Sequence, residues 1–186
     1  MDISQDDRRR IAIAVATIVV LVGAVVGIHI AIRPKTPFEW QHAHAEAMNP
    51  QGLSVELTTA DKRTKYHEGE TILLVAGFSS TARYRYKADI ADGSSVAAAS
   101  DRLHISSGPP ISDMRGIVCC GSRLVGLDDQ PLNVSTHTML KLGPGQYEIY
   151  LTSRRVFKWD DTPIGTSDSS FEVTSNLLKI RVVPAK

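Results

Sequence analysis

An uninterrupted apolar run near the N-terminus constrains this chain more than any other feature. Residues 11–32, IAIAVATIVVLVGAVVGIHIAI, contain one histidine and no Asp, Glu, Lys or Arg. As an α-helix this run spans about 33 Å, which matches a hydrocarbon core of about 30 Å. A signal peptide has a shorter apolar region with a small-residue cleavage site close behind it. Here the nearest A-x-A patterns lie within residues 43–47, so the sequence favours an uncleaved transmembrane anchor over a cleaved leader.

The charges that flank this run set its expected orientation. Three arginines precede it and two cations follow it (Arg8, Arg9 and Arg10; Arg33 and Lys35), so the positive-inside bias is slight. Residues 1–10 are too few to form a domain, and the simplest topology leaves them in the cytoplasm. The sequence therefore predicts a single-pass protein of the cytoplasmic (inner) membrane, with its N-terminus inside and its C-terminal domain periplasmic or otherwise extracytoplasmic.

Small residues form a stripe along the predicted membrane helix. Gly23 and Gly27 make a G-x-x-x-G pair, and Ala12, Ala16 and Ala31 fall on nearly the same face. Such a stripe lets a second helix approach closely. We therefore expect helix packing with a partner membrane protein or with a second copy. The alternative is that the spacing arises by chance, since Gly and Ala are common in membrane helices.

A stalk is predicted between the membrane helix and the domain. Residues 33–52, RPKTPFEWQHAHAEAMNPQG, carry three prolines and a mixed composition. Phe38 and Trp40 are expected to anchor at the membrane interface. A short helix over residues 39–48 is compatible with this segment.

From residue 53 onward the hydrophobic pattern changes to a period of two. Short alternating or apolar runs are separated by Gly, Pro, Asp and Ser, and no long amphipathic helix interrupts them. This pattern is typical of an all-β, immunoglobulin-like antiparallel sandwich, expected over residues 53–186. The predicted strands lie at 53–59, 70–78, 82–90, 132–140, 146–156 and 176–184, and DRLHIS at 101–106 is compatible with a further short strand.

The stretch LGPGQYEIYL predicts a tyrosine corner. Tyr147 follows the Pro144–Gly145 dipeptide, which fits a type II turn, and Ile149 takes the core position two residues further on. A phosphate-binding loop would need a strand before the glycines and a helix after them. Pro144, Gly145 and Tyr147 are therefore interpreted as a structural corner.

Three stretches together carry a family resemblance. They are YHEGETILLVAGFSS, GPGQYEIYLTSRRV and SNLLKIRVV. They are similar to immunoglobulin-like domains of exported bacterial proteins, notably acidobacterial ones, in which a G-E-x-I strand, a P-G-x-Y strand ending in S-R-R and an S-N-bounded last strand recur. The resemblance covers about residues 65–183, with the middle unmatched. It implies a fold and carries no catalytic residue and no activity across.

Two adjacent cysteines, Cys119 and Cys120, lie in the long connection of residues 91–131. Neighbouring Cα atoms are about 3.8 Å apart, below the usual disulfide range. Three states stay open: a strained vicinal disulfide, two reduced thiols, or bonds to another chain or to a metal. The connection itself, which holds SSGPP, GIVCCG and DDQP, is a predicted loop and a candidate binding region because binding residues concentrate in such loops.

A basic sheet face is the second candidate for binding. Strand alternation turns Tyr84, Tyr147, Ile149, Ile180 and Val182 inward. It sends the following residues outward: Arg83, Arg85, Lys87, Tyr150, Arg154, Lys179 and Arg181. Anionic lipid, an acidic protein or a polyanion would suit such a face. The alternative is a solvated face whose cations pair with nearby acids.

No catalytic constellation emerges from the sequence. The histidines lie in separate elements, no G-x-S-x-G is present, and His42, His44 and Glu46 do not align as a metal site. No cofactor is expected. No nucleic-acid partner is expected either, because residues 34–186 carry no net charge and nucleic-acid affinity depends on a basic field. We therefore expect a non-catalytic accessory or scaffolding subunit that packs on a larger membrane complex. The alternative is an extracytoplasmic ligand-binding or adhesion module.

Overall fold

The computed structural model describes part of the chain and divides it into two units. The described residues are 35–83, 85–90, 101–107, 111–112, 124–159 and 170–185. The units are Met1–Thr36 and Pro37–Lys186, and the second contains the predicted sandwich. The predicted anchor with Ala12, Ala16, Gly23, Gly27 and Ala31, and also Tyr84, Cys119 and Cys120, lie outside the described residues. Within those residues, no helix has the length and apolarity to cross a membrane.

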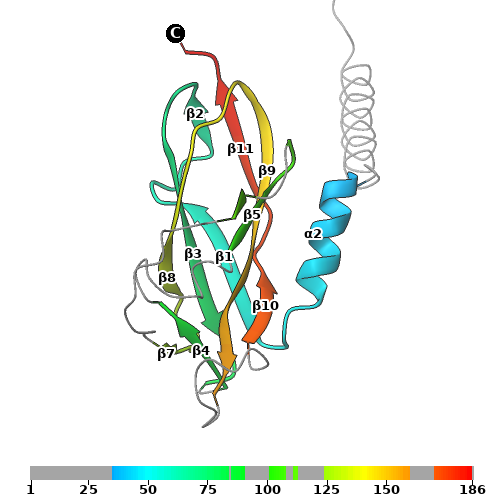
Figure 1. The fold of residues 1–186 in the computed structure, drawn as a ribbon, viewed down its shortest axis with the longest axis vertical. Helices are drawn as coiled ribbons and strands as arrows, with labels where there is room; N and C mark the ends of the chain where they lie inside the picture. Colours follow the sequence, from blue (N-terminus) through cyan, green and yellow to red (C-terminus); the bar gives the residue numbers. More distant parts are fainter. Residues whose placement is uncertain are drawn as a thin grey trace, which may run out of the picture. The chain divides into compact units, whose positions relative to one another are not determined.

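The domain is a two-sheet β-sandwich accompanied by one short helix, α2 (Pro37–Ala47) (Figure 1). The first sheet has the order β1-β3-β8, with antiparallel pairing: β1 (Leu53–Thr59), β3 (Ile72–Ser80) and β8 (Leu132–Leu140). The second has the order β2-β11-β9-β4-β7: β2 (Lys65–His67), β11 (Leu178–Val183), β9 (Gly145–Lys158), β4 (Tyr86–Asp89) and β7 (Leu124–Gly126). The all-β prediction is therefore confirmed.

Three short strands also belong to the second sheet. They are β5 (Arg102–Ile105), β6 (Ile111–Ser112) and β10 (Ser170–Thr174). The strands β5, β6 and β7 fall inside residues 91–131, so the prediction of one long loop there is wrong for the described part. The strand β5 lies within DRLHIS, where the sequence is compatible with a short strand, and burial of Leu103 and Ile105 against β9 explains it.

The core lies between the sheets because alternate side chains of each strand point inward. In β1, Leu53, Val55 and Leu57 are buried while the residues between them are exposed or half-buried. In β11, Ile180 and Val182 do the same from the opposite sheet. This alternation is the reason that a period of two predicted the sandwich.

Strand β9 organises the second sheet. Its 14 residues extend about 45 Å, enough to pair with four other strands. Ile149 pairs with both Leu178 of β11 and Ile105 of β5, so these two strands flank β9 on opposite sides. Further along, β10 pairs with β9 through Thr174 and Thr152, and β4 pairs near its C-terminal end. The strands β10 and β11 are thus two parts of one line, interrupted at residues 175–177.

The corner at the start of β9 has the expected tyrosine hydrogen bond but not the expected turn type. The Tyr147 hydroxyl donates to the Gly143 carbonyl, 2.9 Å away, which is the bond of a tyrosine corner. A type II turn would require a positive φ at Gly145. Among the described glycines, positive φ values occur at Gly52 and Gly69 only, so the type II prediction is wrong. Gly145 already belongs to β9, where it pairs with Val182.

A buried ion pair fixes β9 to its neighbours. Arg155 and Asp101 have side chains that are 1% and 4% exposed, with Nε 2.7 Å from Oδ2. The other carboxylate oxygen accepts from Ser153 Oγ at 2.6 Å, and Arg155 Nη1 lies 3.4 Å from the carbonyl of Asp89. The pairing of β10 with β9 shifts register near Arg154, a β-bulge that adds one residue to β9. The bulge leaves Arg154 exposed and Arg155 buried.

We expect Asp101→Ala to lower the free energy of unfolding by about 3–5 kcal/mol, because it leaves the buried guanidinium of Arg155 without its carboxylate. Urea unfolding followed by circular dichroism measures this. The adjacent Arg154 is a matched control: it pairs with Glu172 at 3.0 Å while both are more than half exposed, so Arg154→Ala should cost at most about 1 kcal/mol. Equal losses in the two variants would contradict a buried pair.

Candidate functional site

The helix α2 packs on the outer face of the second sheet. Its Phe38 and His42 rings lie 5.1 Å from the ring of Tyr150, centroid to centroid. On the same ring, His104 of β5 stacks at 4.4 Å with an interplanar angle of 5°. Tyr150 is only 4% exposed, so its predicted place on an open face is wrong: alternation turns it outward, and the helix then covers it.

The stalk prediction is corrected by the same contacts. A helix was compatible with residues 39–48, and α2 occupies Pro37–Ala47. A stalk would leave that helix without contact to the domain, whereas α2 contacts β9 and β10. Phe38, expected at a membrane interface, contacts Tyr150 instead. Trp40 is 63% exposed.

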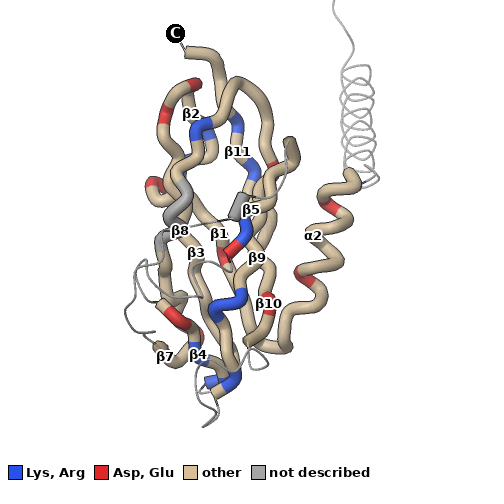
Figure 2. Tube along the Cα trace, in the orientation of Figure 1, with Lys and Arg blue, Asp and Glu red and all other residues tan. Residues whose placement is uncertain are grey.

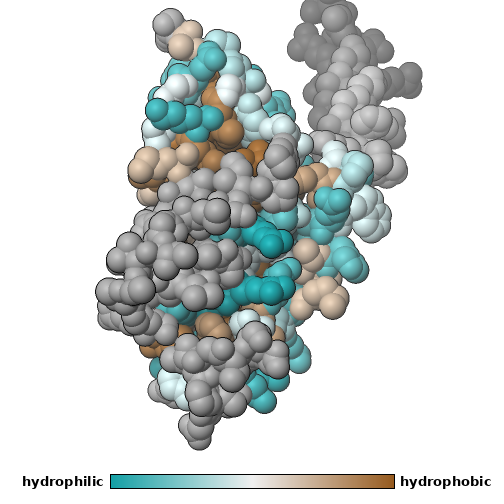
Figure 3. Space-filling view, viewed as in Figure 1, coloured by the Kyte–Doolittle hydropathy of each residue, from teal (hydrophilic) through white to brown (hydrophobic). Residues whose placement is uncertain are grey.

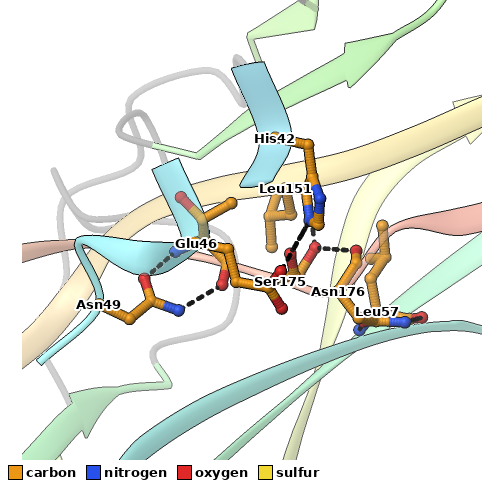
Figure 4. A network of polar contacts seen from close by, with 8 residues as sticks. His42, Glu46, Asn49, Leu57, Leu151, Ser175 and Asn176 are labelled. Atoms are coloured by element: carbon orange, nitrogen blue, oxygen red, sulfur yellow. Dashed lines mark hydrogen bonds and ion pairs between the residues drawn. The ribbon is translucent and has the colours of Figure 1, made fainter. Parts of the chain in front are cut away.

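The C-terminal end of α2 is attached by paired hydrogen bonds (Figure 4). Asn49 Nδ2 donates to the carbonyl of Thr174, and Thr174 N donates to Asn49 Oδ1, both at 2.7 Å. His42 Nε2 donates to the carbonyl of Ser175 at 2.7 Å. The carbonyl only accepts, so Nε2 carries the hydrogen. We call these contacts, made by Phe38, His42 and Asn49, the helix clasp.

The segment held by the clasp also joins the two sheets. The Asn176 side chain pairs with the backbone of Leu57 in β1: Leu57 N donates to Oδ1 at 2.6 Å, and Nδ2 donates to the Leu57 carbonyl at 3.4 Å. On the other side, Leu151 N of β9 donates to Ser175 Oγ at 2.9 Å. Residues 174–176 therefore contact α2, β1 and β9 at one place.

Ion pairs add to the attachment near the start of α2. Lys179 of β11 lies 3.3 Å from Glu39 and 2.9 Å from Glu148. The hydrogen bond to Glu148, followed by that to Glu39, raises the pKa of Lys179. Because the Lys179 side chain is 59% exposed, these pairs contribute little to stability. The clasp depends chiefly on its buried bonds and ring contacts.

We expect Asn49→Ala to loosen α2 without unfolding the sandwich, because it leaves the N–H and C=O groups of Thr174 unpaired. The cost of about 1–3 kcal/mol corresponds to a rise of about 5- to 150-fold in amide hydrogen exchange within α2. Exchange measured by mass spectrometry tests this. Gln41→Ala, an exposed change on the same helix, is the control, and α2 protection that is identical in the two variants would refute the clasp.

The predicted basic face is divided and largely paired. Arg154 pairs with Glu172, and Lys179 with two glutamates, as the solvated-face alternative expects. Arg83 and Arg85 are exposed in the turn before β4. Lys87 lies in β4 and is half-buried, and Arg181 is exposed on β11. Figure 2 shows acidic positions interspersed with basic ones over the domain. The predicted residues do not form one continuous cationic surface.

One polar pocket lies beside the exposed arginines. It has a volume of about 330 Å³ and is lined by Ser80, Thr81, Arg83 and Asp129. A guanidinium and a carboxylate share this pocket, so it offers both signs of charge to a small polar group.

A chain of polar contacts fixes the crossover from β1 to β2. Asp61 accepts hydrogen bonds from the Tyr66 hydroxyl and from Arg63 Nε, and Arg63 also pairs with Glu70 at 3.2 Å. The Tyr66 bond and then the Arg63 bond lower the pKa of Asp61 below its usual value. Thr59 Oγ1 donates to the Arg63 carbonyl at 2.7 Å. These contacts are structural, since Tyr66 lies in the core.

The described residues bring no cluster of metal-ligating side chains together. In that part of the chain, no three His, Cys, Asp or Glu side chains gather as metal ligands. His42 is committed to the clasp, and His44 is exposed on α2. Sequence reasoning missed Asn49, Ser175, Asn176, Asp101 and Arg155. The Asn-Pro and Ser-Asn dipeptides indicate ends of secondary-structure elements, but nothing in the pattern indicates which groups Asn49, Ser175 and Asn176 bond to.

The chain matches no protein-family model and no curated protein sequence.

Stability should depend on pH through His104. Burial, and then the charge of Arg102, lowers the pKa of His104, while Glu172 acts weakly in the opposite sense. The unfolded chain therefore binds the proton first as the pH falls. The His104 contribution is complete above about pH 6.5 and is lost toward the lower folded pKa. Urea unfolding at several pH values should show this decline, and H104Q should reduce it. H67Q, at an exposed histidine, is the control, and an undiminished decline in H104Q would contradict the assignment.

Proposed function

We propose that this protein is a non-catalytic, membrane-anchored accessory or scaffolding subunit. Residues 11–32 would cross the cytoplasmic membrane once, with residues 1–10 inside and an immunoglobulin-like sandwich outside. The helix stripe of Gly23 and Gly27, together with the sandwich, would pack on a larger membrane-protein complex. This protein would position or stabilise its partners and would carry out no reaction of its own.

The helix clasp is the observation that supports this proposal most. The apolar run ends at residue 32 and α2 begins at Pro37, so only four residues separate the predicted span from a helix that is bonded to the sandwich. A free adhesion module benefits from a long, extended linker that lets it search for ligand. A short tether and a fixed first helix suit a subunit whose domain must stay close to neighbours in the same membrane.

The strand order supports the immunoglobulin-like part of the proposal. One sheet orders β1-β3-β8, and the other places β11, β9 and β4 side by side. These correspond to the A-B-E and G-F-C sets of an immunoglobulin-like sandwich, and the corner bond of Tyr147 lies at the start of the F-like strand. Such sandwiches serve many functions, so the fold by itself does not distinguish a subunit from a binder.

The second candidate is an extracytoplasmic ligand-binding module. The polar pocket at Arg83 and Asp129 favours this interpretation, and Arg85, two residues further along the chain, is exposed. The paired state of Arg154 and Lys179 weighs against the broad basic face that was predicted from sequence.

Native mass in mild detergent, with co-migrating proteins identified by mass spectrometry, separates the two candidates. The wild-type protein is expected to migrate in a large assembly. Gly23→Leu with Gly27→Leu should release it, because the added side chains prevent close helix approach. Val25→Leu with Val26→Leu adds bulk elsewhere on the helix and should leave the assembly intact.

The charge variant completes the comparison. Arg83→Glu with Arg85→Glu should leave a subunit in its assembly, whereas a ligand-binding module would lose its ligand. If the wild-type protein migrates alone as a monomer or dimer, the subunit proposal is wrong and the pocket becomes the first place to search.

A further inference from the structure

The outward side of α2 is uncharged and exposed. Six residues lie within about 120° of arc on this helix and its last turn: Pro37, Trp40, Gln41, His44, Ala47 and Met48, all of them exposed. None is Asp, Glu, Lys or Arg. Trp40 is 63% exposed and Met48 is 72% exposed. We call this set the outer face of α2. In Figure 3, hydrophobic surface lies in patches over α2 between hydrophilic ones.

The clasp determines which side of α2 is turned outward. Phe38 and His42 face Tyr150, and Asn49 is bonded to Thr174. Trp40 and Met48 therefore point away from the sandwich, about 12 Å apart along the helix. The ring of Trp40 is amphipathic, and such rings suit a surface that is apolar on one side and wet on the other.

The short tether limits what that surface can contact. Five Cα–Cα steps join residue 32 to Pro37, so α2 begins within about 17 Å of the end of the apolar run. The headgroup layer beyond the hydrocarbon core is about 5–7 Å thick. Trp is enriched at that depth because its ring is amphipathic. Arg33 and Lys35 in the tether attract anionic headgroups and would draw the helix toward the lipid.

A second copy of the chain fits this face poorly. With 11 residues, α2 is about 16 Å long and about 10 Å wide. Its outer face thus offers on the order of 160 Å² per partner, whereas a stable dimer interface buries roughly 800 Å² per partner. A flat lipid surface requires no such area, because the transmembrane anchor already supplies the binding free energy.

We propose that the outer face of α2 lies on the headgroup layer of the bilayer that residues 11–32 cross, with Trp40 as the inserted side chain. This inference rests on the proposed membrane anchor. The clasp then transmits the orientation of α2 to the sandwich, so lipid contact through Trp40 and Met48 fixes the pose of the domain at the membrane surface.

The two tryptophans of the chain, Trp40 and Trp159, provide the test. In W159F the emission comes from Trp40 alone, and in W40F from Trp159 alone. The full-length protein is placed in vesicles of phosphatidylcholine and phosphatidylglycerol, some of them brominated near the headgroup. We expect Trp40 emission to be blue-shifted and quenched by this lipid, and Trp159 emission to be quenched far less. If W159F folds poorly, fluorotryptophan in the wild-type chain reports both sites by fluorine NMR with a paramagnetic lipid.

The outcomes separate the inference from the proposed function. If the protein fails to float with vesicles after an alkaline wash, the membrane anchor itself is wrong. If it floats but aqueous iodide, and not brominated lipid, quenches Trp40, the anchor stands and the lipid contact is overturned. If neither quencher reaches Trp40, a protein surface covers the outer face, which also overturns the lipid contact.

Discussion

The arrangement of the domain depends on the break between β10 and β11. Ser175 keeps its bonds to Leu151 of β9 while its carbonyl accepts from His42 of α2, and Asn176 bonds to Leu57 of β1. In an uninterrupted strand, the backbone N–H and C=O groups of residues 175 and 176 would bond to the neighbouring strand only. Because the chain breaks at this point, one short segment connects both sheets and the helix.

The long strand β9 is shared among several partners. Its 14 residues outnumber those of each strand that pairs with it. Its flanks are shared between β11 and β10 on one side and β5 and β4 on the other. The bulge at Arg154 and the buried pair of Arg155 with Asp101 fix the register where the partners change. Stability and register therefore depend on the same few polar groups.

The helix α2 connects fold to function. Its inner side is committed to Tyr150 and to residues 174–175, which leaves its outer side as the surface that comes directly after the predicted membrane anchor. In the proposed arrangement, the domain would be attached to that anchor through α2, which is bonded to the sandwich. This geometry is consistent with a protein that acts by holding its domain in one place, and it gives the exposed Trp40 a physical reason to be where it is.

The sequence by itself determined the local features of this protein. Alternation or a short apolar run identified the strands around Leu53, Ile72, Leu132, Ile149 and Ile180, and a period of two reports which face of a strand is buried. The tyrosine corner was also readable, since Gly143 and Tyr147 are four residues apart and their bond is local. The turn type was not, because pairing with Val182 decides the backbone of Gly145.

Only the tertiary structure decided which distant groups meet. Nothing in the pattern around Tyr150 indicates that a helix more than a hundred residues earlier covers it. Likewise Asp101 and Arg155, or Asn49 and Thr174, are ordinary polar residues until the fold brings them together. The reason is physical: hydrophobic periodicity specifies the face that a residue presents, whereas the partner of a buried polar group is set by the packing of whole elements, to which local sequence makes no reference.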